Sequence, residues 1–327
     1  MASSAERGPS AGADAEAKAP SFFERADHHD AVVQGLLSGV LPLKFAYAGS
    51  AAYTHDRLAR GEGYQSVTGL GTLARRALSE LREPGAGPVR LAEIGPGNGR
   101  HTAEVFRQLR QDKFPPVSYL ALDFSETLLE VAAQRLHGDP LLATGLHHSF
   151  WDVESGPTAA IEEWRAGDAA SLSVLFVGNT LGNLEDPVAA LAHVRHSVRA
   201  GDRLILGVTL RDPADDVEAL RAPYLTEVFE DAALEPLLAL GIDRRLLDLS
   251  IVYDASADQV VGEVRLLGAV PAGEAEVPAG HTVRCFRSRR FDLDEVHAIV
   301  SAAGWKREAD HLEPGTRHAV VTASSPG

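Results

Sequence analysis

Short apolar segments alternate with amphipathic stretches through the middle of the chain, and this alternation limits the fold more than any other feature. Five segments have the length and apolar character of strands: Val89 to Ile94, Ser118 to Asp123, about His147 to Trp151, Ser173 to Val177 and Arg203 to Val208. Helical stretches separate them, at about Thr102 to Arg110, Ser125 to Leu136, Ala159 to Ala166 and Pro187 to Val198. Strands joined by helices build a parallel sheet with both faces covered. The sequence therefore predicts an α/β fold with a doubly wound sheet.

The flanking regions follow other patterns. Residues 1–20 are rich in Ala, Ser, Gly and charged residues without apolar periodicity, which predicts a disordered tail. From Phe22 to about Leu81, apolar residues three and four positions apart predict helices. After Asp212 we expect a helical stretch and then strands at Leu247 to Tyr253, Val260 to Val270 and His281 to Phe291. A last helix at Leu293 to Ala303 and a last strand at His318 to Ala323 follow.

The charge balance argues against a nucleic-acid partner. Acidic residues outnumber Lys and Arg by 46 to 31, and the net charge of -15 repels a polyanion. The one candidate basic patch comprises Arg284, Arg287, Arg289 and Arg290. Alternation along a strand would divide these side chains between two faces, so we interpret the segment as a solvated edge.

Other classes of partner are also disfavoured. No segment approaches the roughly 20 apolar residues that span a bilayer, and the N-terminus lacks the order of a signal peptide, so we expect a cytoplasmic protein without membrane contact. Cys285 is the single cysteine. It cannot form a disulfide within the chain, and without neighbouring ligands it makes no zinc site, so we expect a strand residue and no metal.

A glycine-rich turn follows the first expected strand and leads directly into a helix. It runs from Glu93 to Thr102 and has glycines at 95, 97 and 99. Glycines allow a tight turn and a close ligand, and the helix N-terminus offers unpaired amides. Such a turn fits NAD, FAD or phosphate binding as well, but Glu93 suits a cofactor that bears an ammonium and a sulfonium. Asp123, at the end of the second strand, can accept hydrogen bonds from both ribose hydroxyls. We predict S-adenosylmethionine as the cofactor.

The third and fourth expected strands end in further polar and glycine-rich segments. Asp152 can accept a hydrogen bond from the adenine amino group, or it can be the N-cap of a helix in the following segment. Gly178 and Gly182 permit close approach where the transferable methyl and its acceptor should meet. Asn183 can donate and accept at once and so orient a polar substrate, unless Gly182 and Asn183 form only a turn.

Several motifs resemble one family, the histidine-specific N-methyltransferases of ergothioneine biosynthesis and their relatives acting on tryptophan and other amino acids. Segment 44–50 resembles the family's Lys-x-Phe-Tyr-Asp-x-x-Gly-Ser, and 62–64 is similar to its Glu-Tyr-Tyr. Segment 93–102 resembles its cofactor turn, and 176–183 resembles Phe-Leu-Gly-Ser-Thr-Ile-Gly-Asn. The strand at 204–210 is similar too.

The resemblance implies a class I methyltransferase with a Rossmann-like sheet and a second, substrate-capping α+β domain. We expect the cap at 21–71 plus 213–290, and the cofactor domain at 72–212 plus 291–327. Residues expected at the cofactor are Glu93, Gly95, Gly97, Asn98, Asp123, Phe124, Asp152 and Gly178. Residues expected at the substrate are Tyr47, Tyr64, Asn179, Asn183, Tyr224, Gly262, Phe286 and Ser288. Of these, Tyr47, Tyr64 and Asn183 are the expected catalytic residues, two tyrosines orienting the acceptor nitrogen and Asn183 the substrate carboxylate or amine.

Departures from the family pattern concern the substrate. Where the family has a glutamate that grips the histidine ring, this chain has Phe286, which cannot bind an imidazole by charge. A methionine of the family pocket falls at Gly262, which we expect to enlarge the space. The loop after the fifth strand is shorter than in the family, so the role of the family's tyrosine in that loop does not transfer directly to Tyr224. The sequence thus predicts N-methylation of a small molecule other than histidine, an amino acid or a secondary metabolite derived from one, with a bulkier or less polar side chain.

Four other functions remain open at this point. The same scaffold can serve O-methylation or intramolecular ring closure. It can also act as a non-catalytic partner subunit, although the intact glycine turn and Asp123 argue against that. A nicotinamide oxidoreductase is a more distant possibility. The sequence does not indicate an oligomeric state.

Overall fold

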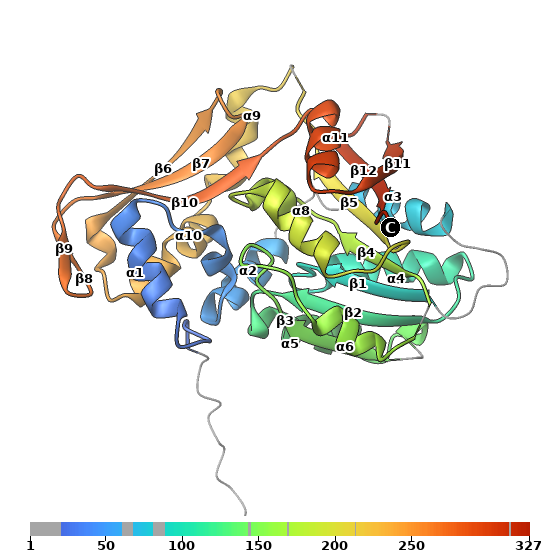
Figure 1. The fold of residues 1–327 in the computed structure, drawn as a ribbon. Coiled ribbons are helices and arrows are strands. Elements are labelled where there is room, and N and C mark those ends of the chain that lie inside the picture. Colours follow the sequence, from blue (N-terminus) through green and yellow to red (C-terminus); the bar gives the residue numbers. More distant parts are fainter. Residues whose placement is uncertain are drawn as a thin grey trace, which may run out of the picture.

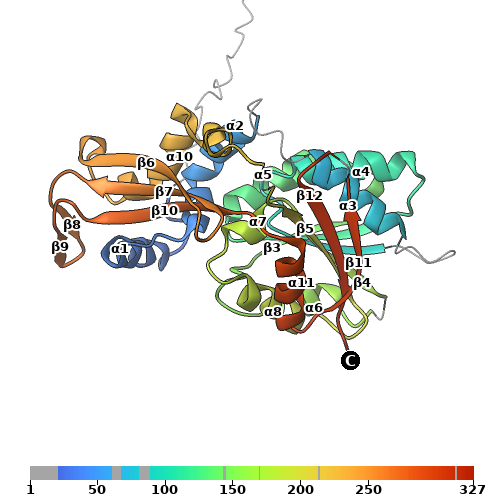
Figure 2. The ribbon, with the colours of Figure 1, turned by 90° about the horizontal axis from the view of Figure 1, so that it is seen from above.

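The computed structural model describes residues 21–60, 68–80, 89–142, 145–168, 170–212, 214–313 and 315–327. These residues form two lobes that lie side by side (Figures 1 and 2). The sheet lobe is built on a seven-stranded sheet, and the cap lobe on a three-stranded sheet, as described for these ranges. The expected tail at 1–20 and the expected site residue Tyr64 lie outside the described residues.

The described strands of the sheet lobe have the order β11-β12-β5-β4-β1-β2-β3. The parallel strands are β1 (Val89–Ile94), β2 (Val117–Asp123), β3 (Leu146–Phe150), β4 (Leu172–Phe176) and β5 (Arg203–Thr209). Each begins and ends within one residue of its predicted position. The chain winds outward from β1 to β3 and then returns to the other side of β1. The predicted doubly wound sheet is therefore confirmed, and its switch point lies between β1 and β4.

Alternation along the strands divides the core between the two faces of this sheet. On β1, for example, Leu91 belongs to one buried cluster and Ala92 to the other. The first cluster contains α3 (Thr68–Glu80), α4 (Arg100–Gln111) and α5 (Glu126–Leu136). The second contains α6 (Ala160–Arg165), α8 (Pro187–His196) and α11 (Leu293–Ala302). The predicted helices are thus present, and both faces of the sheet are covered.

Two antiparallel strands extend the sheet at the β5 edge. The predicted strand β12 (His318–Ser324) pairs with β5, and β11 (Lys306–Leu312) pairs with β12. The strand β11 has no strand pattern in the sequence, because its residues are mostly charged. Charged, exposed side chains are common on edge strands, where one side of the strand is unpaired and both faces can meet water.

The cap lobe brings together two distant parts of the chain. Its sheet has the order β10-β7-β6, with β6 (Leu247–Asp254), β7 (Gln259–Leu266) and β10 (Thr282–Arg289). The N-terminal part supplies α1 (His28–Ser38), the 3-10 helix η1 (Leu43–Tyr47) and α2 (Ser50–Arg60). The later part supplies α9 (Val217–Arg221), the 3-10 helix η4 (Ala222–Tyr224) and α10 (Glu227–Ala239). Apolar residues from both parts form one buried cluster.

Two details of the cap lobe differ from the sequence analysis. The segment expected as one strand from Val260 to Val270 ends at Leu266, and the chain then forms a hairpin of β8 (Val270–Ala272) and β9 (Ala275–Val277). The expected domain boundary at residue 71 falls inside α3, and Leu70 already packs with the sheet lobe. The division into two domains otherwise stays a proposal.

The basic segment of β10 is neutralised by acidic neighbours. Arg284 and Arg287 both donate to Glu185, over 2.7 and 3.1 Å, and Arg289 pairs with Glu295. These three side chains are therefore paired, and they form no free basic face. Cys285 between them is buried, as expected for a strand residue. No helix in the described ranges is long and apolar enough to cross a membrane.

Candidate active site

The turn after β1 lies at the carboxyl edge of the sheet, beside the switch point. Gly97 has φ of 55° and Gly99 has φ of 72°, a left-handed conformation that favours glycine. At Gly99 a Cβ would lie 3.0 Å from the backbone of Ala132, so glycine also lets α4 approach α5. At Gly97 the nearest atom to such a Cβ is His55 Nε2, 3.9 Å away. The turn is therefore closely packed on its α5 side and faces an imidazole on the other.

Glu93 lies under this turn, at the end of β1. Its side chain is buried, and its Oε2 accepts hydrogen bonds from Thr102 Oγ1 at 2.7 Å and from Tyr119 OH at 2.6 Å. Burial raises the pKa of this carboxyl group. The two hydroxyls hold one carboxylate oxygen in place, which fixes the direction of the other. Tyr119 and Thr102 are supporting residues that sequence reasoning did not identify.

Asp123 ends β2 and faces the glycine turn. Its Oδ2 accepts from the Gly97 amide at 3.3 Å, and its Oδ1 accepts from the Ser125 amide at 3.0 Å. The side chain of Asn98 is engaged by the cap lobe, because its Nδ2 donates to Asp56 on α2 at 2.7 Å. The structure thus brings Asp123 to the turn, and it gives the Asn98 side chain a role in joining α2 to the turn.

Burial raises the pKa of Asp123 to about 6, although the Ser125 and Gly97 amides oppose this shift. Only the ionised carboxylate can accept hydrogen bonds from two ribose hydroxyls. Because the pKa is raised, the accepting form dominates above pH 6 and is lost below it. We expect the affinity for S-adenosylhomocysteine to fall about tenfold between pH 7 and pH 5, measured by calorimetric titration. Asp123→Asn, which has no carboxyl group there, should lose most of this dependence, and an equal dependence in both proteins would contradict the assignment.

Phe124 and Asp152 lie where the cap lobe meets the ends of β2 and β3. The Phe124 ring stacks on His28 of α1, with centroids 4.8 Å apart, and it contacts Phe45 edge-on at 5.3 Å. Asp152 Oδ2 accepts from Lys44 Nζ at 2.6 Å. Asp152 Oδ1 also accepts from the Glu154 amide at 3.2 Å within a turn. The helix that follows, α6, has Ala159 at its N-cap, so Asp152 is not the helix cap that was the alternative expectation. A contact with adenine for Asp152, and a contact with the cofactor for Phe124, stay predictions.

The turn after β4 contains Gly178, Asn179 and the short helix α7 (Thr180–Asn183). Thr180 Oγ1 is 3.4 Å from the Cβ position of Gly95, so the β4 turn and the β1 turn are adjacent. At Gly182 a Cβ would lie 2.4 Å from the carbonyl oxygen of Arg289. The expectation for Gly182 is therefore corrected, because this glycine lets α7 approach β10 and does not open space for a ligand.

Three expected substrate residues from three different elements meet beside α7. Ser288 Oγ on β10 accepts from Asn179 Nδ2 at 2.9 Å and from Tyr224 OH on η4 at 3.0 Å. The Tyr224 ring also lies 4.8 Å from the ring of Phe286, which is two residues before Ser288 on the same face of β10. Phe229 of α10 completes an aromatic cluster, 5.2 Å from Tyr224 and 4.8 Å from Phe286. Phe229 was not among the residues predicted at the site, because its only signal in the sequence is an apolar position in a helix.

Gly262 does not enlarge this region as expected. It pairs with Phe286 in the antiparallel register of β7 and β10. A Cβ at Gly262 would lie 3.0 Å from the Phe286 Cβ and 3.4 Å from Ile251 Cδ1. The room left by the missing side chain is thus filled by Phe286 and Ile251.

Tyr47 reaches the site from η1 and lies against His55 of α2. The two ring centroids are 4.7 Å apart, and the rings meet edge to face. Asn183 ends α7 and is partly exposed. Since His55 also faces Gly97, the Tyr47 and His55 pair connects the cap lobe to the glycine turn. Among the described residues, no group of His, Cys, Asp and Glu side chains could hold a metal ion.

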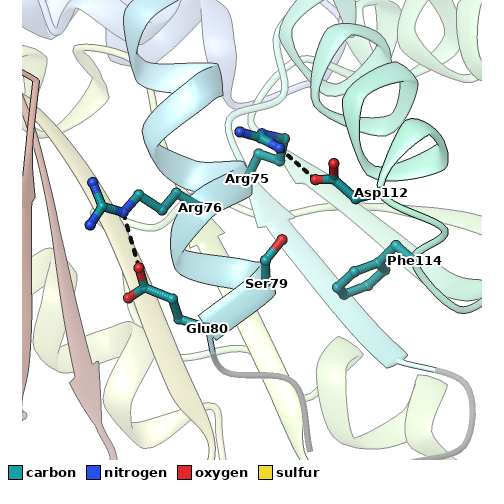
Figure 3. A pocket seen from close by; sticks show the side chains of 6 residues that line it. All are labelled: Arg75, Arg76, Ser79, Glu80, Asp112 and Phe114. Carbon is teal, nitrogen blue, oxygen red and sulfur yellow. Dashed lines mark hydrogen bonds and ion pairs between the residues drawn. The ribbon is translucent and has the colours of Figure 1, made fainter. Parts of the chain in front are cut away.

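A pocket of about 250 Å³ lies elsewhere, between the last turns of α3 and α4 (Figure 3). Arg75 of α3 pairs with Asp112, which follows α4, and Arg76 pairs with Glu80 along α3. Because α4 begins at the carboxyl end of β1, these last turns lie at the opposite edge of the sheet. No residue expected at the site lines this pocket, whose walls also include Ser79 and Phe114.

Comparisons with solved structures find similar chains at low identity. The carbon methyltransferase CurJ is 14% identical, with a TM-score of 0.46, over 91% of this chain and 67% of that one. CalS10, an amino pentose methyltransferase from Micromonospora echinaspora, is 15% identical, with a TM-score of 0.40, over 83% and 95%. The citrinin polyketide synthase CMeT domain structure is 13% identical, with a TM-score of 0.43, over 86% of this chain. This chain spans 55% of the length of that last structure. No curated protein sequence matches the chain significantly.

The sequence also matches a family profile described as histidine-specific methyltransferase, SAM-dependent, over residues 29–325. This range includes both lobes, the glycine turn and every described residue expected at the site. The glycine turn, with an acidic residue at the end of each of the first two strands, fits the S-adenosylmethionine that this family uses. The chain therefore belongs to the SAM-dependent, histidine-specific methyltransferase family, and it is an enzyme that uses S-adenosylmethionine as methyl donor.

Proposed function

We propose that this enzyme N-methylates an amino acid, or a secondary metabolite derived from one, whose side chain is bulkier or less polar than that of histidine. The resemblance to a family of N-methyltransferases supports an amine nitrogen as the acceptor of the methyl group. The departure at Phe286, where the family has a glutamate, supports a substrate side chain other than that of histidine. The substrate residues proposed are those named from the sequence, including Tyr64, together with Phe229.

The aromatic cluster of Tyr224, Phe229 and Phe286 carries this proposal. Phe286 is 7% exposed and packs on both other rings, so a ligand in contact with it meets hydrocarbon. An imidazole in the same place would leave its ring nitrogens without the glutamate that the family pattern provides. Burying a polar group without a partner costs on the order of 1–3 kcal/mol. The cluster therefore favours an aromatic or aliphatic side chain.

Each part of the site has a role in this proposal. S-adenosylmethionine supplies a methyl group that is activated by its sulfonium. Asp123 holds the ribose, and the second carboxylate oxygen of Glu93, Oε1, faces the positive groups of the aminoacyl arm. Asn183 orients the substrate carboxylate or amine, and Tyr47 orients the acceptor nitrogen with its lone pair free. Alignment of acceptor, methyl and sulfur at near-attack distance lowers the barrier of such a displacement.

The test is a panel of amino acids and their decarboxylated or O-blocked derivatives, incubated with enzyme and S-adenosylmethionine. Mass spectrometry should show a gain of one to three methyl groups together with S-adenosylhomocysteine. We expect Trp, Phe, Tyr or Leu derivatives to react with higher kcat/KM than histidine. Preferred turnover of histidine would contradict the proposal, and a product without added methyl groups would favour ring closure.

A further inference from the structure

His55 occupies a position beside the cofactor turn that no sequence motif assigned. It lies on α2, in the cap lobe, and its side chain crosses to the sheet lobe. Its Nε2 is 3.9 Å from the point that a Cβ at Gly97 would occupy. The centroid of its ring is 4.7 Å from the centroid of the Tyr47 ring. The imidazole therefore lies between the glycine turn and a residue proposed to hold the substrate.

The residues around the glycine turn leave the side that faces His55 for the aminoacyl arm of the cofactor. Asp123 lies on the β2 side of the turn, where the sugar is proposed to bind. Thr180 and the β4 turn lie on the other side of β1, next to Gly95, where the acceptor is proposed. The remaining direction leads from Gly97 toward His55 on α2 and His101 in the first turn of α4.

The chemistry of this region suits a neutral hydrogen-bond donor. The aminoacyl arm ends in a carboxylate and an ammonium, close to a sulfonium. The acidic groups nearby are Glu93, Asp123 and Asp56, and Asp56 is already paired with Arg60 and Arg135. A carboxylate among these acids needs N–H donors, whereas an added cation would repel the sulfonium.

Both histidines are neutral at physiological pH. Burial lowers the pKa of His55 to about 4, with Asp56 opposing the shift. Burial also lowers the pKa of His101 to about 4, and the nearby Arg100 and His55 lower it further. A neutral imidazole still has one N–H, and the tautomer follows the partner that it meets.

We propose that His55 is a cofactor-binding residue whose imidazole donates a hydrogen bond from Nε2 to the carboxylate of the aminoacyl arm. His101 lies beside it and lines the same end of the site from α4. This inference rests on the proposed placement of the nucleoside over Asp123. It adds a contact from the cap lobe, so that cofactor binding joins the two lobes.

The test uses calorimetric titration with three ligands that share the nucleoside. They are S-adenosylhomocysteine, its decarboxylated analogue S-adenosyl-3-thiopropylamine, and 5′-methylthioadenosine, which lacks the aminoacyl arm. His55→Ala should weaken S-adenosylhomocysteine roughly tenfold, as expected for a lost hydrogen bond to a charged group. It should leave the other two ligands within about twofold. His55→Gln, which keeps an N–H donor, should recover part of the affinity.

Two control variants distinguish the His55 contact from the nucleoside placement on which it depends. His137→Ala changes an exposed histidine at the C-terminal end of α5 and should bind all three ligands as the wild type does. Asp123→Ala should weaken all three, because each carries the ribose. If His55→Ala leaves S-adenosylhomocysteine unchanged, or weakens all three ligands equally, the proposed contact is wrong. If Asp123→Ala leaves all three unchanged, the nucleoside placement itself is wrong.

Discussion

Replacing Asp123 with alanine should weaken binding of S-adenosylhomocysteine by about 10- to 150-fold. The carboxylate is proposed to accept hydrogen bonds from the ribose hydroxyls, and a hydrogen bond to a charged group contributes about 1.5–3 kcal/mol. Asp123 also accepts from the Gly97 amide at 3.3 Å, so its loss would loosen the turn on which the cofactor lies. Calorimetric titration at pH 7.5, well above the pKa of Asp123, measures the effect with the carboxylate fully ionised.

Asp112→Ala is the matched control for this prediction. Asp112 follows α4 and pairs with Arg75 at the far edge of the sheet (Figure 3). Its loss removes a carboxylate of the same size without touching the glycine turn, and we expect unchanged affinity. Equal affinity of Asp123→Ala and the wild type would show that the ribose does not lie on Asp123.

Replacing Phe286 with glutamate should lower kcat/KM for the preferred apolar substrate by about 30-fold or more. The new carboxylate would lie between the rings of Tyr224 and Phe229, and a charged group left buried without a partner costs about 2–5 kcal/mol. The kcat/KM for histidine, whose imidazole can pair with that carboxylate, should fall much less. The measurement is the ratio of kcat/KM for the apolar substrate to that for histidine, in the variant and in the wild type.

Phe286→Leu controls for the loss of the ring. Leucine keeps an apolar side chain at this position, so the variant should retain the preference for the apolar substrate while losing some packing. Thermal unfolding of both variants shows whether the fold survives. The ratio of kcat/KM for the two substrates is independent of the fraction of folded enzyme. An unchanged ratio in Phe286→Glu would show that Phe286 does not contact the substrate.

The sheet lobe follows closely from local sequence signals. Each parallel strand is a short apolar run between amphipathic helices, and both the period of the pattern and the turn residues are encoded within about ten positions. The predictions of β1 to β5 hold to within a residue for this reason. The strand β11 lacks this signal, because an edge strand can be charged, and only its pairing with β12 identifies it.

The candidate site divides in the same way. The glycine turn and Asp123 stand beside recognisable strand ends, so the sequence alone indicated the cofactor and the methyltransferase fold. The neighbours of the site depend on contacts between elements far apart in the chain. Gly262 looked like added space, yet the register of β7 and β10 places Phe286 against it.

By itself, the sequence determined the doubly wound sheet, its cofactor turn and the family, because periodicity and turn chemistry are local properties. Only the tertiary structure decided that Tyr224, Phe229 and Phe286 form one aromatic cluster, that Gly182 serves the approach of α7 to β10, and that His55 faces Gly97. The aromatic cluster arises from packing within the cap lobe, and the other two arrangements arise from the packing of the cap lobe against the sheet lobe. Such packing depends on the shapes of many side chains at once, and no short segment encodes it.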